Sequence, residues 1–106
     1  MHVVLHYMDG DSLSTIIKVD YTTKKVEIEN FTDDNIARAF GVNLHPTMQD
    51  FEEFLEDRCF PREGFDMKRR LKDFDIDFYD PRLIIEKTQG RVYGDDMWID
   101  VKEGVL

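Results

Sequence analysis

The first 30 residues carry the hydrophobic pattern of short β-strands separated by tight turns. Residues 2–8 and 13–19 are rich in β-branched and aromatic side chains, which favour strands. Asp9-Gly10 lies between these runs and is typical of a hairpin turn, because glycine accepts a positive φ. Residues 26–29 alternate apolar and acidic side chains, as in a strand with one face in water. The pattern predicts a three-stranded antiparallel meander.

Helical spacing replaces this alternation in the next segment. Thr32 is a candidate N-cap for a short helix over residues 33–40, which Gly41 would end. Thr47 precedes a clearer helix over residues 48–58. At 100° per residue, the large apolar side chains of that helix fall on one side: Met48, Phe51, Phe54 and Leu55.

The second half predicts two more helices and a final strand. Residues 65–74 place apolar side chains at helical spacing among basic ones. Asp80-Pro81 is a strong start signal, with aspartate as N-cap and proline at the first position of a helix over 81–87. Residues 97–101 have the composition of a strand. We therefore predict an α+β fold, in which an N-terminal antiparallel meander and a closing C-terminal strand are packed on one side by three or four short helices.

The length of 106 residues suits one domain, so we expect residues 1–106 to form a single domain. Apolar residues make up 42% of the chain, which is enough to build a core. The residues on the apolar stripes of their elements are expected to be mostly buried: Phe51, Phe54, Leu55, Leu71, Phe74, Ile84, Ile85, Trp98 and Ile99.

The formal net charge of −9 narrows the class of partner. Residues 1–60 hold 12 acidic and 5 basic side chains, whereas residues 61–106 hold 11 and 9, so the acidity belongs to the first half. Such a charge disfavours direct DNA binding and anionic membrane surfaces. It favours a basic partner, or a protein or ribonucleoprotein whose basic surface normally holds nucleic acid. Solubility alone is the other explanation of this charge.

Cys59 is the only cysteine, which excludes an internal disulfide and a thiolate-rich zinc site. No apolar run reaches the roughly 18 residues of a membrane span, and the N-terminus lacks the features of a signal peptide. We therefore expect a cytoplasmic protein that does not contact membranes.

Candidate metal sites are incomplete in the sequence. Asp73, Asp75 and Asp77 alternate like the first ligands of a calcium loop, but the required glycine and glutamate positions hold Phe78 and Ile84. The pair Asp95-Asp96 could bind magnesium with Glu86, but no nuclease-like Glu-x-Lys completes that site. We expect neither a metal nor a cofactor.

Catalytic motifs are equally weak. Cys59 beside Arg58 could have the lowered pKa of a nucleophile, yet its place at the border of an apolar helix face favours a buried structural thiol. Residues 87–91 superficially resemble a phosphate loop, but they follow a helix, and Gly90 there fits a helix C-cap. The three histidines are scattered. We expect the protein not to be an enzyme.

The best candidate for function is the acidic face of the helix over 48–58. Its five carboxylates spread over an arc of about 160° and occupy about 10 Å of helix, a charge density comparable to the phosphates of a nucleic-acid strand. The predicted partner-binding residues are Asp50, Glu52, Glu53, Glu56 and Asp57. The alternative is an ordinary solvated face, partly neutralised by ion pairs with the basic helix around residues 68–72. If the acidic face is not the contact, the alternative surface is basic: Arg58, Arg62, Lys68, Arg69 and Arg70.

Four segments resemble a poorly characterised family of small proteins from Gram-positive bacteria and their mobile elements. They are residues 54–62 (FLEDRCFPR), 79–81 (YDP), 84–91 (IIEKTQGR) and 96–99 (DMWI). The same arrangement resembles a segment of HipA-like kinase proteins of those bacteria. The resemblance covers residues 51–101 and includes none of the kinase's catalytic motifs.

Two functions follow from the resemblance. Small acidic proteins of mobile elements are often inhibitors of host defence, so the first is an anti-CRISPR protein that blocks a type II CRISPR nuclease, by nucleic-acid mimicry through the acidic face. The second is an accessory or antitoxin component of a HipA-like kinase toxin–antitoxin system. The resemblance implies no catalytic residue for this chain.

Overall fold

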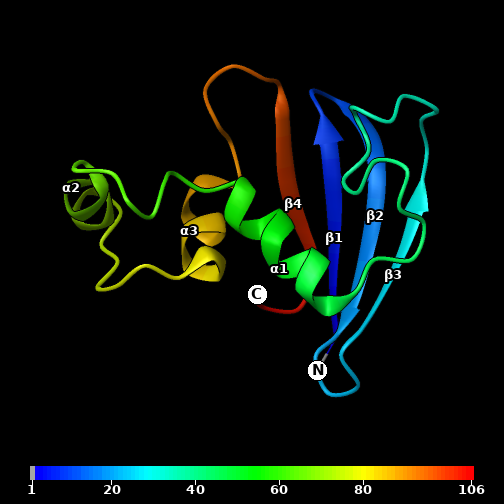
Figure 1. The fold of residues 1–106 in the computed structure, drawn as a ribbon, viewed down its shortest axis with the longest axis horizontal. Helices are drawn as coiled ribbons and strands as arrows, with labels where there is room; N and C mark the ends of the chain where they lie inside the picture. Colours follow the sequence, from blue (N-terminus) through cyan, green and yellow to red (C-terminus); the bar gives the residue numbers. More distant parts are fainter. Residues whose placement is uncertain (1) are drawn as a thin grey trace.

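The computed structural model describes residues 2–106 and contains one four-stranded antiparallel sheet. The strands lie in the order β3-β2-β1-β4, so the last strand of the chain pairs with the first (Figure 1). The strands are β1 (His2–Asp9), β2 (Ser12–Asp20), β3 (Lys25–Asn30) and β4 (Met97–Glu103). The predicted meander and the closing C-terminal strand are both confirmed.

Three helices join the sheet: α1 (Met48–Asp57), α2 (Met67–Asp73) and α3 (Pro81–Thr88). Helix α1 lies across one face of the sheet, α3 lies beyond β4, and α2 is the element farthest from the sheet (Figure 1). This arrangement confirms the α+β class. Within residues 2–106, none of the helices has the length and apolarity needed to cross a membrane.

Local signals explain where these elements begin and end. Gly10 takes a φ of 56° in the turn between β1 and β2, as a tight hairpin requires. Asp80 caps α3, because its Oδ1 accepts the backbone N–H of Arg82 at 3.0 Å. At the other end of α3, Gln89 and Gly90 both adopt left-handed φ values of 58° and 66°. A Cβ at Gly90 would stand 2.9 Å from Cδ1 of Ile99, so any larger residue would force the Ile99 side chain to move and would be strained by the positive φ.

The main core lies between the sheet and α1. It is formed by the inward side chains of all four strands together with the apolar side of α1, and its completely covered members include Val3, Leu5, Ile17, Phe51 and Ile99. Burying each of these side chains contributes about 1.5–3 kcal/mol to the stability of the fold. A second cluster holds α2 against α3: Phe60, Leu71, Ile76 and Ile84.

Seven of the nine predicted core residues are buried, and the other two are half-buried. Phe74 stacks on Phe60 at the rim of the second cluster, with ring centroids 6.3 Å apart. Trp98 alternates with the buried Ile99 and points to the opposite side of β4. There its Nε1 donates to the carbonyl of Gly10 at 2.8 Å.

The predicted helix over residues 33–40 is wrong, because this segment forms turns. Thr32 does cap locally, but its Oγ1 accepts from the N–H of Asp34, whose own Oδ1 accepts from Ile36. Such short-range side-chain bonds compete with helical hydrogen bonding. The N–H of Ala39 donates to Oγ1 of Thr15 on β2, a contact that sequence reasoning had no means to foresee.

Candidate functional site

The acidic helix α1 begins at a capping box. The Oγ1 of Thr47 accepts the N–H of Asp50 at 3.1 Å, and Oδ2 of Asp50 accepts the N–H of Thr47 at 2.9 Å. The same carboxylate oxygen accepts from Nδ2 of Asn43 at 3.2 Å. The hydrogen bonds from Thr47 hold the pKa of the Asp50 carboxyl below its usual range. Asp50, one of the predicted contact residues, is thus half-buried and engaged in fixing the start of α1.

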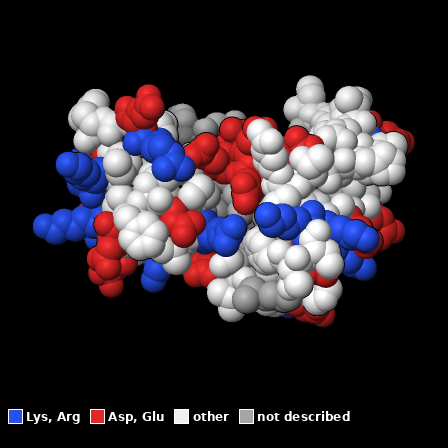
Figure 2. All heavy atoms as spheres, turned by 60° about the horizontal axis from the view of Figure 1, so that its bottom comes forward, with Lys and Arg blue, Asp and Glu red and all other residues white. Residues whose placement is uncertain are grey.

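The other four predicted contact residues share the outward side of α1. Glu52, Glu53, Glu56 and Asp57 are all exposed, while Phe51, Phe54 and Leu55 are buried against the sheet. The apolar side anchors the helix, so the carboxylates have a fixed position relative to the fold. Seen from this side, acidic side chains gather around a hollow in the middle of the molecule (Figure 2).

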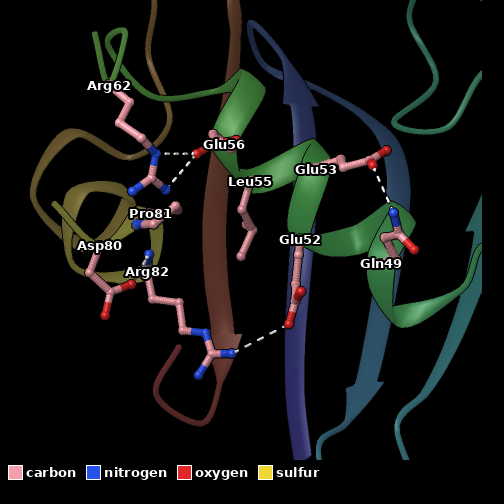
Figure 3. A pocket seen from close by; sticks show the side chains of 9 residues that line it. All are labelled: Gln49, Glu52, Glu53, Leu55, Glu56, Arg62, Asp80, Pro81 and Arg82. Carbon is pink, nitrogen blue, oxygen red and sulfur yellow. Dashed lines mark hydrogen bonds and ion pairs between the residues drawn. The ribbon is translucent and has the colours of Figure 1, made fainter.

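Two of these carboxylates form ion pairs with arginines from outside α1. Oε1 of Glu56 accepts from Nη2 and Nε of Arg62 at 2.6 and 3.0 Å, and Oε1 of Glu52 lies 3.8 Å from Nη2 of Arg82 (Figure 3). The basic helix α2 does not supply these cations, contrary to the alternative drawn from the sequence. Arg69 of α2 instead pairs with Asp66 at 3.3 Å.

Glu53 and Asp57 are free of basic partners within residues 2–106. Glu53 accepts one hydrogen bond, from Nε2 of Gln49 at 3.3 Å (Figure 3). These two carboxylates therefore contribute net negative charge to the surface. Of the five predicted carboxylates, Glu52 and Glu56 are partly compensated by arginines, Asp50 is engaged in the capping box, and Glu53 and Asp57 are exposed without a basic partner within residues 2–106.

A groove of about 590 Å³ runs between α1 and α3, and three of the α1 carboxylates line it. Leu55 and Pro81 supply its apolar lining, while its charged residues are four acids and two arginines: Glu52, Glu53, Glu56, Asp80, Arg62 and Arg82 (Figure 3). Four carboxylates against two guanidinium groups leave a surplus of two negative charges. The groove suits a cationic side chain with an apolar stem better than an anion.

Arg82 is held between the groove and the core. Its guanidinium lies 4.9 Å from the ring centroid of Tyr21, which itself packs edge-on against Phe51 at 6.4 Å. Burial raises the pKa of Tyr21, so the ring stays neutral beneath the arginine. This stacking fixes Arg82 beside Glu52 and leaves the ion pair partly open to water.

Arg58 is not part of a contact surface, which corrects the alternative basic site. The side chain is buried, with 7% relative exposure. Its guanidinium donates to both carboxylate oxygens of Asp95 at 2.9 and 3.1 Å, and to the carbonyls of Gly90 and Met97. The sequence held a signal for this burial, because position 58 lies seven residues after Phe51 and therefore on the apolar stripe of the helix.

The remaining basic residues do lie on the surface. Lys68, Arg69 and Arg70 are exposed on α2, and Arg62 is exposed between the two helices. Arg62 also stacks on Tyr79 at 4.4 Å, and Arg70 lies 5.6 Å from the ring of Phe60. Lys and Arg side chains gather at the α2 end of the molecule, interspersed with acids (Figure 2).

The Cys59 thiol has the environment of a structural residue. It is half-buried and donates to the carbonyl of Leu55 at 3.2 Å. Burial, reinforced by nearby carboxylates, raises its pKa to about 12. A nucleophilic thiol needs the opposite shift, because the thiolate is the reactive form. The geometry therefore favours the structural reading of this residue.

The candidate metal ligands are not brought together. Asp95 is held by Arg58, and the hydrogen bonds from that arginine keep the pKa of its carboxyl below the usual range. Across residues 2–106, no group of three His, Cys, Asp or Glu side chains has an arrangement that could hold a metal ion. Residues 87–91 span the C-terminal end of α3, whose C-cap is Gln89, so this helix presents its C-terminus to them.

No protein-family model, curated protein or solved structure matches this chain. The fold and the surface define a small acidic α+β protein with a charged groove between α1 and α3. Its function must be inferred from the geometry of that groove and of the helix beside it.

Proposed function

We propose that this protein is a binding protein without catalytic activity, which presents the carboxylates of α1 to a basic surface of a partner. The observation that carries this proposal is the arrangement of Glu52, Glu53, Glu56 and Asp57, all exposed on one firmly anchored helix. A capping box fixes the start of this helix and three buried apolar side chains fix its orientation. The charges are therefore preorganised, and binding requires little additional ordering.

The groove explains how a partner's Lys or Arg would be held. Its stem would lie on Pro81, over the buried Leu55, and its charged head would reach Glu53 at the rim. The internal cations Arg62 and Arg82 compete for the neighbouring carboxylates, but exposed ion pairs contribute only about 0–1 kcal/mol. A partner cation can therefore join or replace them at small cost.

A surface rich in Lys and Arg, which this helix would bind, is what proteins use to hold nucleic-acid phosphates. We extend the proposal to inhibition of a nucleic-acid-handling effector, in which α1 occupies a site meant for phosphates. The resemblance over residues 51–101 directs the first test to a type II CRISPR nuclease. The net charge of −9 supports this choice, because charges of opposite sign accelerate association and orient the two molecules.

The experiment is target cleavage by a type II CRISPR nuclease with its guide RNA, with and without the purified protein. We expect cleavage to fall as the protein is added, and an excess of target DNA, which competes for the same site, to restore it. A parallel arm expresses the protein beside a HipA-like kinase. Unchanged cleavage together with relief of kinase toxicity would replace this proposal with an antitoxin role.

A further inference from the structure

Strand β3 forms a free edge of the sheet. It pairs with β2 on one side only, and no other helix or strand lies along its outer side (Figure 1). Its six residues keep a regular register with β2, without a bulge and without proline. Bulges and prolines are common ways to protect an edge against pairing with another chain, and β3 has neither.

The backbone groups of Val26 and Ile28 point away from β2. The N–H of Phe31 donates to the carbonyl of Ser14 at 2.8 Å, which identifies this pair as hydrogen-bonded. Hydrogen-bonded and non-hydrogen-bonded pairs alternate along an antiparallel ladder. Counted back from Phe31, Glu29 and Glu27 form hydrogen-bonded pairs with β2, whereas Ile28 and Val26 form non-hydrogen-bonded pairs. The backbone N–H and C=O groups of Val26 and Ile28 therefore point to the outer edge of the sheet. Within residues 2–106, their backbone groups make no hydrogen bond on that side.

The side chains of β3 divide into two rows, with Val26, Ile28 and Asn30 on one face and Lys25, Glu27 and Glu29 on the other. Val26 and Ile28 are half-buried and pack on the main core from its margin. Glu27 and Glu29 are exposed on the opposite face, and no ion pair within residues 2–106 involves them. A shallow hollow of about 240 Å³ is lined on β3 by Glu27, Ile28 and Glu29 and on β2 by Ile16 and Lys18. Lys18 lies across from Glu27 in the register, whereas Glu29 has the apolar Ile16 as its neighbour on β2.

We propose that β3 accepts an added strand from a partner protein, and that this strand alternates apolar residues with Lys or Arg. Its backbone would pair with the outward groups of Val26 and Ile28. Its apolar side chains would extend the core margin, while its cations would face Glu27 and Glu29 as cross-strand pairs. A second copy of this chain is a poorer occupant, because it brings another net charge of −9. The edge is separate from the α1 groove, so this proposal goes beyond the binding function proposed above.

The first experiment uses a capped peptide of about eight residues in which Val and Lys alternate, long enough for one strand. We expect it to bind, and we expect amide hydrogen exchange at Val26 and Ile28 to slow when it does. The amide of Glu27, which belongs to a pair within the sheet, serves as the internal reference. Binding without added protection at Val26 and Ile28, or no binding at about 1 mM peptide, would overturn the proposal.

Two variants test the contribution of backbone hydrogen bonds and that of the carboxylates separately. Ile28→Pro removes an outward N–H without removing a bond to β2, and should abolish peptide binding. Glu27→Lys with Glu29→Lys should weaken the Val-Lys peptide roughly tenfold and favour a Val-Glu peptide. If Ile28→Pro does not fold, the charge variant and the exchange measurement decide. A dimer of the unmodified protein that Ile28→Pro dissociates would assign the edge to a second copy and contradict the proposal, as would unchanged affinity in the charge variant.

Discussion

The Arg58 guanidinium and the Asp95 carboxylate face each other fork to fork, with Nη1 to Oδ2 at 2.9 Å and Nη2 to Oδ1 at 3.1 Å. The pair joins the end of α1 to the segment that leads into β4. Because Arg58 also donates to the carbonyls of Gly90 and Met97, one side chain ties three parts of the chain together. It thereby fixes the direction in which the acidic side of α1 points.

Replacing Arg58 by lysine should destabilise the fold. An ammonium group cannot make the two parallel bonds to Asp95 and still reach both carbonyls, so we expect a loss of about 2 kcal/mol in the free energy of unfolding. Urea denaturation measures it. Arg69→Lys, an exposed change on α2, is the matched control and should be nearly neutral. Equal stability of the two variants would mean that Arg58 is not a structural tie.

The contribution of Asp95 should depend on pH with a defined sign. The hydrogen bonds from Arg58 lower the pKa of Asp95 in the folded state. Its stabilisation is therefore present above the unfolded pKa, near 3.9, and is lost as the pH falls through the lower folded value. Asp95→Asn should cost about 1 kcal/mol or less at pH 7, since the carboxylate is partly exposed. The difference between the two proteins should shrink in urea titrations at successively lower pH, and a difference that grew on acidification would contradict this sign.

The Cys59 thiol should react slowly with disulfide reagents. With its pKa raised to about 12, little thiolate exists at pH 8. After allowing for the greater intrinsic nucleophilicity of a high-pKa thiolate, we expect a rate roughly thirtyfold below that of the unfolded chain. A colorimetric thiol assay with and without denaturant measures this ratio. Equal rates in the two states would contradict the structural role.

Removing an internal competitor should strengthen partner binding. Arg62→Ala frees Glu56 and makes the groove more negative, so a basic partner should bind more tightly, by about twofold to fivefold. Arg69→Ala removes the same charge from α2, where its partner is Asp66, and is the matched control. Titration of both variants with one partner preparation makes the comparison. Weaker binding by Arg62→Ala alone would indicate that the basic surface makes the contact.

Sequence patterns predicted the elements whose signals are local. The capping residues Thr47 and Asp80 placed the starts of α1 and α3 correctly. The content of β-forming residues, together with the period-two pattern of residues 26–29, located all four strands to within about two residues. The turn segment 33–40 was missed because its conformation depends on side-chain bonds at Thr32 and on the distant contact to Thr15.

The candidate site was predicted less completely, since its charges are set by contacts between distant segments. The sequence identified the acidic side of α1 but could not show that Arg62 and Arg82 lie beside it. It also placed Arg58 on the surface by residue type, although helical periodicity put that position on the buried side. A charged residue type predicts an exposed side chain, except where a partner such as Asp95 pairs with the charge inside the fold.

The central claim is that the free carboxylates of α1 make the contact with the partner. The most direct test is the affinity of Glu53→Lys with Asp57→Lys for the type II nuclease–guide complex, because these changes break no ion pair within residues 2–106. Asp11→Lys with Asp77→Lys makes the same change in net charge at two other exposed positions and is the control. We predict that the α1 variant stays folded and loses at least about tenfold in affinity, with a weaker dependence on salt, while the control changes little. A folded α1 variant that binds as tightly as the unmodified protein would contradict the account.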